Sequence, residues 1–491
     1  EVFRRFYVNP AIGNDLADGT QSAPFKTLEE VKTAVRGINS YMTGDIEVYL
    51  AGGIYEINET IRFTAEDSGK NGFKIVYKTT EQPVLSGGIS ISGWELYDEK
   101  NNIYRVNVGN QIVRQMYING KRAVRARSDG SMGIKVSSDM SGCITEDADI
   151  ANWSRPSDIE VVFKKQFYSP RCVVQSVSST QDGTFLTFNS AIWYTMTVGY
   201  GDYMKFTSGD EAWYIENAYE LLDEEGEWYH NREDGYMYYK PYPTENMSDA
   251  DVILPACERL LSVEEGASNI KFSGIAFENA AWNYPTENHG HTHTQNGMLV
   301  NSNATPEAGV GVSDAKNIEF SGCSFTKMGS SGLNILRGSK NITVTDNVFT
   351  ELSGAGANIG EVSGDSRNPS EEEDIVENIT FENNRIYDTS KEFYGASALG
   401  VGYVRKSSFS YNKIYNQPYT GIHIGWGWSF AADSVIEQVK VKGNCISDVM
   451  TVLRDGGGIY TLGASNAQEP LYTNEITENY IKRVYEGGSI Y

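Results

Sequence analysis

The second half of the chain repeats one short phrase, an alternating strand pattern that runs through a turn into a second short strand. The copies are NIKFSGIAF (269–277), NIEFSGCSF (317–325), NITVTDNVF (341–349), NITFENNRI (378–386), SSFSYNKI (407–414), QVKVKGNCI (438–446) and NEITENYI (474–481). In the last five copies an Asn holds the same turn position, at Asn347, Asn384, Asn412, Asn444 and Asn479. Such self-similarity at intervals of a few tens of residues is the signature of a repeat architecture.

The repeats predict an all-β solenoid, a parallel β-helix. No segment between them has the 3.6-residue period of a helical solenoid, and the signature of a WD40 propeller is absent. In a β-helix each coil stacks on the next at about 4.8 Å, so equivalent residues form ladders. A buried Asn repeated on successive coils can hydrogen-bond along such a ladder, as amides do in other stacked sheets.

The first half of the chain has a different organisation. Residues 6–35 combine a strand, a Gly/Asp-rich turn and an amphipathic helix, which we expect to cap the open end of the solenoid. From about Trp94 to Ile253 the phrase disappears, and hairpin-like patterns predict an inserted antiparallel β-sandwich. We therefore expect a cap with first coils (1–93), an inserted β region (94–253) and the main β-helix with its groove (254–491).

Composition narrows the possible partners. The net charge is −24, and no basic stripe is visible in the sequence, so nucleic acid is not expected as a partner and anionic polymers are disfavoured. No apolar run approaches the length of about 20 residues that spans a bilayer. The five cysteines are scattered, without a CxxC pair, so neither a disulfide framework nor a thiolate zinc site is indicated. The 31 Tyr, 19 Phe and 8 Trp suit platforms on which sugar rings stack.

A Gly-led strand follows each turn, and aligning these strands predicts a polar column. The column contains Asn334, Asn358, Ser397, His423 and Tyr460. Because side chains alternate along a strand, polar residues flanked by apolar ones indicate an outward-facing groove.

Two carboxylates flank one turn beside this column, in the stretch SDVMTVLRDGGGIYTLG (447–463). Asp448 ends one strand, and Asp455 precedes three glycines that let a ligand approach the backbone closely. A pair of carboxyls across a sugar-sized gap is what a glycosidase requires, one to protonate the leaving oxygen and one to attack or to activate water. An Asp before glycines is also a common turn former, so a purely structural role stays open.

A histidine cluster lies in NYPTENHGHTHTQNG (283–297), where His289, His291 and His293 alternate. On an extended segment all three imidazoles would face one side. A metal site, a sugar-binding loop and a solvated loop are the three alternatives, since imidazoles suit zinc but no carboxylate pattern completes a site.

The N-terminal stretch FYVNPAIGNDLADGTQSAPFKTLEE is similar to the first coil of right-handed parallel β-helix carbohydrate enzymes. GIHIGWGW, followed by two aspartates seven positions apart and a glycine run, resembles glycoside hydrolase family 136. That resemblance implies a retaining lacto-N-biosidase, which releases lacto-N-biose (Galβ1-3GlcNAc) from lacto-N-tetraose, a human milk oligosaccharide. It makes Asp455 the nucleophile and Asp448 the acid/base. The expected substrate-binding residues are Trp428, as a stacking platform, and Trp426, His423, His291, His293, Gln295, Tyr460 and Arg454.

The same resemblance implies a bacterial extracellular or cell-surface protein, whose targeting segment would be absent from this chain. It further implies an oligosaccharide as substrate, no cofactor for the chemistry, a possible structural Ca²⁺ and a possible dedicated folding chaperone. Two other readings stay open. One is a β-helix exo-glycosidase of another family, such as a family 120 β-xylosidase, and the other is a non-catalytic glycan-binding adhesin. A polysaccharide lyase fits less well, because it needs a basic groove for uronates.

Overall fold

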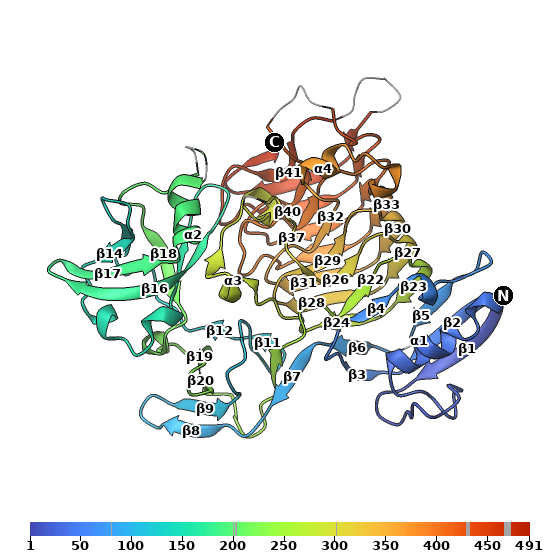
Figure 1. Cartoon of the computed structure of the whole chain (residues 1–491), viewed down its shortest axis with the longest axis horizontal. Helices are drawn as coiled ribbons and strands as arrows, with labels where there is room; N and C mark the ends of the chain where they lie inside the picture. The colour runs from blue at the N-terminus through green and yellow to red at the C-terminus, as the bar shows by residue number, and fades with distance from the viewer. Residues whose placement is uncertain (80, 200, 202–203, 301, 429–432, 466–472) are drawn as a thin grey trace.

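The computed structural model describes residues 1–491 except 80, 200, 202–203, 301, 429–432 and 466–472. Three parallel sheets wind along most of the chain, and this arrangement confirms the predicted parallel β-helix (Figure 1). Each coil contributes one strand to each sheet, so the chain passes through sheets 1, 2 and 3 in turn before it repeats.

Sheet 1 contains β1 (Val2–Val8), β2 (Asp45–Leu50), β5 (Ile75–Lys78), β23 (Ser268–Ser273), β27 (Lys316–Ser321), β30 (Lys340–Thr345), β33 (Glu377–Glu382), β36 (Ser408–Ser410), β39 (Lys440–Lys442) and β42 (Glu475–Thr477). Sheet 2 contains β3 (Gly53–Glu56), β6 (Pro83–Ser86), β24 (Ala276–Glu278), β28 (Ser324–Met328), β31 (Val348–Leu352), β34 (Arg385–Tyr387), β37 (Lys413–Tyr415), β40 (Cys445–Val449) and β43 (Tyr480–Val484). Sheet 3 contains β4 (Ile61–Phe63), β22 (Leu261–Val263), β26 (Ala308–Val312), β29 (Ser331–Ile335), β32 (Ala357–Ile359), β35 (Leu399–Val401), β38 (Ile422–Gly425), β41 (Gly457–Leu462) and β44 (Gly488–Ile490).

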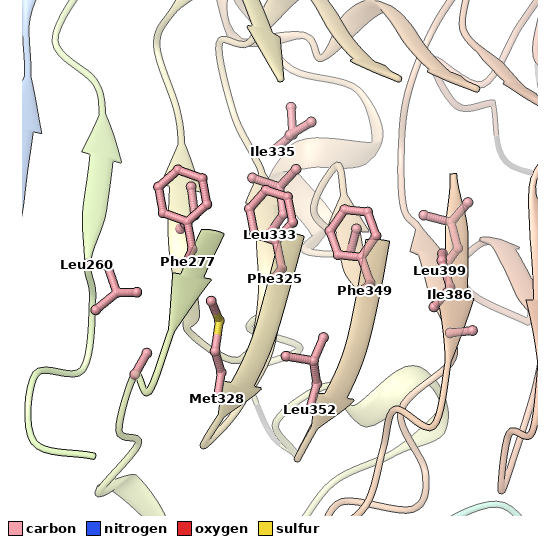
Figure 2. Packing of buried hydrophobic residues seen from close by; sticks show 14 of the residues in the cluster. Leu260, Phe277, Phe325, Met328, Leu333, Ile335, Phe349, Leu352, Ile386 and Leu399 are labelled. Atoms are coloured by element: carbon pink, nitrogen blue, oxygen red, sulfur yellow. The ribbon is translucent and has the colours of Figure 1, made fainter. Parts of the chain in front are cut away.

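The core runs along the inside of the coils as ladders of like residues. Phe277, Phe325 and Phe349 lie on successive strands of sheet 2, and their rings stack at 5.2 and 4.6 Å between centroids (Figure 2). Leu333 and Leu399, from sheet 3, close the interior on the opposite side. Parallel in-register stacking therefore brings each apolar side chain onto its equivalent in the next coil.

Helix α1 (Leu28–Arg36) lies beside β1, where the solenoid begins (Figure 1). Thr27 caps it by accepting a hydrogen bond from the backbone N–H of Glu30 at 3.3 Å. Leu28, Val31 and Val35 are its buried apolar face, as the amphipathic pattern predicts.

The chain leaves the β-helix through β7 (Gly88–Ile91) and returns through β21 (Val252–Pro255), which pair antiparallel. Between them lie three antiparallel or mixed sheets, drawn from light blue to green beside the coils in Figure 1. Their strands are β8 (Glu95–Asp98), β9 (Ile103–Asn107), β10 (Tyr117–Ile118), β11 (Lys121–Arg122), β12 (Val124–Arg125), β13 (Lys135–Val136), β14 (Cys143–Thr145), β15 (Glu160–Phe163), β16 (Arg171–Thr180), β17 (Gly183–Phe188), β18 (Ala212–Glu216), β19 (Glu227–Asn231) and β20 (Tyr236–Tyr239).

Three further short helices are α2 (Ser190–Tyr194), α3 (Tyr284–Glu287) and α4 (Gly364–Arg367). Among the residues that the structure describes, no helix has the length and apolar character needed to cross a membrane. The inserted sheets do not stand apart from the solenoid, because β25 (Gly290–His291), which follows α3, pairs with β16.

The repeated Asn residues form the predicted amide ladder at the turn between sheets 1 and 2. Asn347, Asn384, Asn412 and Asn444 each donate a side-chain hydrogen bond to the amide oxygen of the next Asn, at 2.9–3.1 Å. Each amide also donates to a backbone carbonyl of the preceding coil, as Asn412 does to Phe381 at 3.0 Å. The ladder thus satisfies backbone and side-chain groups that are almost fully buried.

We expect Asn412→Ala to lower the free energy of unfolding by about 3 kcal/mol, because it leaves several buried donors and acceptors without partners. Urea denaturation measures the change. Asn110→Ala, at an exposed position, is the matched control and should change stability by less than about 0.5 kcal/mol. Equal stability of the two variants would show that the ladder adds nothing to the fold.

Candidate active site

The outer face of sheet 3 carries the predicted polar column, with one correction. Cross-strand register aligns Asn334, Asn358, Gly400, His423 and Tyr460 on successive coils. Ser397, predicted for this column, lies three residues before the aligned Gly400. The connection from β34 to β35 is longer than in neighbouring coils, so the strand begins later than its leading glycine suggested.

A segment between β24 and β26 covers this face. Gln295 and Asn296 lie over the column, and the amide of Asn296 occupies the space that a side chain at position 400 would need. Gly400 is therefore required for close packing of this segment on the sheet. The cover is also tied to the inserted region, since His293 Nε2 accepts a hydrogen bond from the backbone N–H of Ser169 at 3.1 Å.

The covered face holds polar atoms that lack hydrogen-bond partners among the described residues. They are both ring nitrogens of His423, both side-chain amide atoms of Asn296, Oε1 of Gln295 and Oγ of Ser397. The His423 ring is fully buried, at 5.3 Å from the ring of Tyr460 and 5.9 Å from that of Trp426. Buried polar groups normally have partners, so this cluster is suited to a ligand that brings hydroxyl groups.

Burial makes His423 a source of pH-dependent stability, because it lowers the pKa of this side chain from 6.5 to about 3. Below pH 6.5 the unfolded chain binds a proton that folded His423 does not bind, so stability falls as the pH falls from 6.5 toward 3. At about 1.4 kcal/mol per pH unit, this residue accounts for about 3 kcal/mol of loss between pH 6.5 and 4.5. Urea unfolding at pH 6.5 and at pH 4.5 measures this effect. The free energy of unfolding of His423→Gln should fall between the two pH values by about 3 kcal/mol less than that of the wild type. A loss equal to that of the wild type would contradict the assignment.

Asp455 lies beside the end of the column, in the turn between β40 and β41. Its backbone carbonyl accepts a hydrogen bond from the hydroxyl of Tyr419 at 2.8 Å. Its carboxylate is hydrogen-bonded to the hydroxyl of Tyr491 and raises the pKa of that phenol. Burial and, secondly, the Asp455 charge raise the pKa of Tyr460 to about 12, and Tyr460 also hydrogen-bonds Gln295. The structure thus brings Asp455, Tyr460, Gln295 and His423 into one cluster.

Asp448 has a different environment, although it flanks the same turn. It ends β40 with a left-handed backbone (φ 56°), and its two carboxylate oxygens accept hydrogen bonds from the guanidinium of Arg483, both at 2.5 Å. These bonds lower the pKa of Asp448 to about 2. A catalytic acid has to carry a proton near neutral pH, and this pairing favours the anion instead.

Glu486 is an acidic residue beside Arg454 that the sequence analysis did not consider. Glu486 occupies the position of the next coil that is equivalent to Asp455, because Gly457 is in register with Gly488 and the backbone N–H of Gly488 donates to the carbonyl of Gly456 at 3.1 Å. The signal was present as a second copy of one motif, because DGGGIY (455–460) recurs as EGGSIY (486–491). Asp448 pairs with a cation of the next coil, whereas the residue of the next coil that is equivalent to Asp455 is a second acid.

The remaining predicted residues divide between the site and its rim. Trp426 is buried, and the ring of Trp428, 62% exposed, lies 5.7 Å from it. Arg454 is exposed, with its guanidinium Nε 3.5 Å from the carboxylate of Glu486, and its backbone N–H donates to the carbonyl of Gln166. The inserted region therefore reaches the turn between β40 and β41 through the loop that contains Gln166.

The histidine segment is only partly buried, because His291 and His293 are buried whereas His289 is exposed. The rings of His291 and His293 stack at 4.8 Å, so two of the three imidazoles share one side, and the prediction that all three do so does not hold for His289. His291 packs against Trp282 and Phe393, and burial lowers its pKa well below the usual range. Across the described part of the chain, no group of three or more His, Cys, Asp or Glu side chains is arranged to hold a metal ion.

Comparison with known proteins agrees with this architecture. Residues 101–242 match a family model described as the GH141 insertion domain, and residues 291–446 match one described as a right-handed β-helix region. No curated protein sequence matches the chain. A solved structure described as a glycoside hydrolase is 26% identical, with a TM-score of 0.89 over 99% of this chain and 89% of its own.

Two further solved structures match with lower scores. A complex of XylC with xylose has a TM-score of 0.47 and 10% identity, covering 98% of this chain and 75% of its own. A GH136 lacto-N-biosidase from Eubacterium ramulus has a TM-score of 0.36 and 11% identity, covering 98% and 68%. Family 136 specifically therefore stays a prediction. The insertion match and the similarity to a glycoside hydrolase over nearly the whole chain identify this protein as a glycoside hydrolase of the right-handed parallel β-helix type.

Proposed function

We propose that the protein hydrolyses a glycosidic bond with Asp455 and Glu486 as its two catalytic carboxyl groups. The observation that carries this proposal is their position on adjacent coils, at equivalent places in a repeated motif. Adjacent coils lie about 4.8 Å apart. We propose a retaining mechanism for this pair, in which the two carboxyl groups are about 5–5.5 Å apart, whereas an inverting one needs about 6.5–9.5 Å.

The two environments suggest the roles. Asp455 is partly buried between Tyr460 and Tyr491 and suits the nucleophile, which attacks the anomeric carbon while the bond to the leaving oxygen breaks. Glu486 has a half-exposed side chain and suits the acid/base, which gives its proton to that oxygen. Glu486 then takes a proton from water as the water attacks the anomeric carbon and releases Asp455. Arg454 stabilises the ionised form of Glu486 only weakly, because the ion pair between the two side chains is exposed and its closest atoms are 3.5 Å apart. Glu486 can therefore still carry the proton that an acid needs.

Sugar binding in this proposal uses the covered face of sheet 3. His423, Gln295 and Asn296 hold unpartnered polar atoms that ring hydroxyls would satisfy. Trp428 is exposed beside the buried Trp426 and offers a ring for stacking. His291 and His293 are buried within the covering segment. We therefore assign them to positioning of that segment rather than to direct contact with sugar.

The specific activity we propose is that of a lacto-N-biosidase, which is what the motif in residues 421–463 implies. Incubation with lacto-N-tetraose, followed by identification of the products, tests it directly, and release of lacto-N-biose is the expected result. Cleavage of an aryl xyloside, with lacto-N-tetraose left intact, would support the β-xylosidase alternative. Binding without cleavage across a panel of glycans would support the adhesin alternative and contradict the hydrolase proposal.

A further inference from the structure

A cavity of 880 Å³ lies between the inserted region and the β-helix. The charge of its lining residues differs from that of the chain as a whole. Its lining includes Thr451, which belongs to the same turn as Asp455. The backbone N–H and the hydroxyl of Thr451 both donate to the carbonyl of Gln417, at 3.2 and 3.0 Å. The turn that contains Asp455 thus contributes one residue to the cavity wall, and the volume of the cavity is that of a typical ligand site.

The floor of the cavity is electrically balanced. Arg114, Arg125 and Arg171 are almost fully buried there, and they form ion pairs with three carboxylates, those of Glu160, Glu216 and Glu392. The adjacent guanidinium groups lower the pKa of Glu392 to about 2 against the opposing effect of burial. This network is rigid and has no net charge, so it provides a fixed surface rather than an attraction for a ligand.

The walls carry an excess of positive charge. Lys121, Arg122, Arg127 and Lys391 line them, against the carboxylates of Glu351 and Asp388. Both carboxylates are near cations already, since Lys391 lies within 3.6–3.7 Å of each. The walls therefore have two more cations than anions, in a protein whose net charge is −24. A local reversal of sign in a concave site attracts an anion.

Neutral groups orient two of these cations, and one of the two, Arg122, also has its Nε 3.9 Å from Oε2 of Glu351. Arg122 donates to Ser353 Oγ and to the carbonyl of Glu351, both at 3.0 Å. The guanidinium of Arg127 lies 5.4 Å from the ring centre of Tyr214 and forms no ion pair with any carboxylate among the described residues. Arg127 is thus an exposed guanidinium, aligned by an aromatic ring, whose charge has no anionic partner.

We propose that this cavity binds a carboxylated sugar, a uronate unit of an oligosaccharide. This inference goes beyond the proposed function, because lacto-N-tetraose is neutral and the cavity is then a second, anion-binding carbohydrate site of the same protein. The overall charge of the chain disfavours anionic polymers, but the fold gathers basic side chains from 121–127 and 391 at one place. Planar guanidinium groups can hold a carboxylate through two hydrogen bonds.

The test is equilibrium binding of trigalacturonic acid, with its fully methyl-esterified form as the uncharged match, to the full chain by calorimetry. We expect the acid to bind wild type at least 10-fold more tightly than the ester, with affinity that falls as salt rises. Arg127→Gln should weaken binding of the acid at least 10-fold and leave the ester unchanged. Lys100→Gln is the control, because it removes the same charge from an exposed position in the inserted region outside the cavity lining.

Equal binding of acid and ester to the wild type, or equal affinity of the Arg127→Gln and Lys100→Gln variants for the acid, would overturn the proposal. Circular dichroism and thermal unfolding of both variants show whether each is folded, and a calcium-free buffer excludes bridging by that ion. Because binding is measured without turnover, the result is independent of hydrolysis. Failure of lacto-N-tetraose and aryl glycosides to be cleaved would count against the proposed function and not against this site.

Discussion

Asp455→Asn should reduce turnover by a factor of at least about 10⁴ on any glycan that the wild type cleaves, because it removes the nucleophile that forms the covalent intermediate. The fold should survive the change. Asp455 has a left-handed backbone (φ 57°), and Asn is the residue other than Gly that tolerates this conformation best. The hydrogen bond from Tyr419 goes to the backbone carbonyl of residue 455 and is kept.

Single-turnover kinetics with an aryl glycoside measures this effect, and a mass shift of the wild-type protein with a 2-fluoro glycoside locates the covalent adduct. Recovery of the modified peptide that contains Asp455 would agree with the assignment. A variant with near wild-type turnover would remove Asp455 from the mechanism, whatever the role of its neighbours. Adduct formation at Glu486 would instead exchange the two roles.

Glu486→Gln should slow hydrolysis of natural glycosides by a factor of about 10²–10⁴, the usual contribution of a general acid/base. The loss should be much smaller for aryl glycosides, whose leaving group needs no proton, until release of the intermediate becomes limiting. Azide, which attacks without a general base, should then restore turnover and give a glycosyl azide of retained configuration. Nuclear magnetic resonance of the product establishes both points.

Asp448→Asn is the matched comparison for Glu486→Gln, and it decides between the pair predicted from sequence and the pair proposed here. It removes the ion pair with Arg483, an exposed contact that contributes at most about 1 kcal/mol. We expect less than a threefold change in turnover. A large loss in Asp448→Asn, together with unchanged activity in Glu486→Gln, would restore Asp448 as the acid/base.

The choice between Asp448 and Glu486 depends on information that the sequence analysis did not use. Both acids lie within one coil of Asp455, and the sequence analysis selected the one that is closer along the chain. In a solenoid, distance along the chain is a poor guide, because a residue one full coil away can be stacked on its equivalent at about 4.8 Å. The recurrence of the acid-Gly-Gly motif contained this information, and only the register of β41 and β44 gives it a geometrical meaning.

The same limit explains the column on sheet 3. Strand identities and the alternation of polar and apolar residues were sufficient to predict Asn334, Asn358, His423 and Tyr460 as one outward-facing row. Ser397 was misplaced because the length of the preceding connection, rather than local pattern, sets where β35 begins. The segment between β24 and β26, which covers this row, has irregular structure. It has no periodic pattern of apolar residues from which its position could be predicted.

The sequence by itself determined the coil, the amide ladder and the turn that carries Asp455, because each depends on residues that repeat at the same place in every coil. Tertiary structure alone decided that Asp448 pairs with Arg483, which polar atoms are buried without partners, and how basic side chains of an acidic chain meet in one cavity. The physical reason is that local pattern specifies a strand and its faces, whereas charge pairing and burial depend on neighbours that only stacking and the inserted region provide.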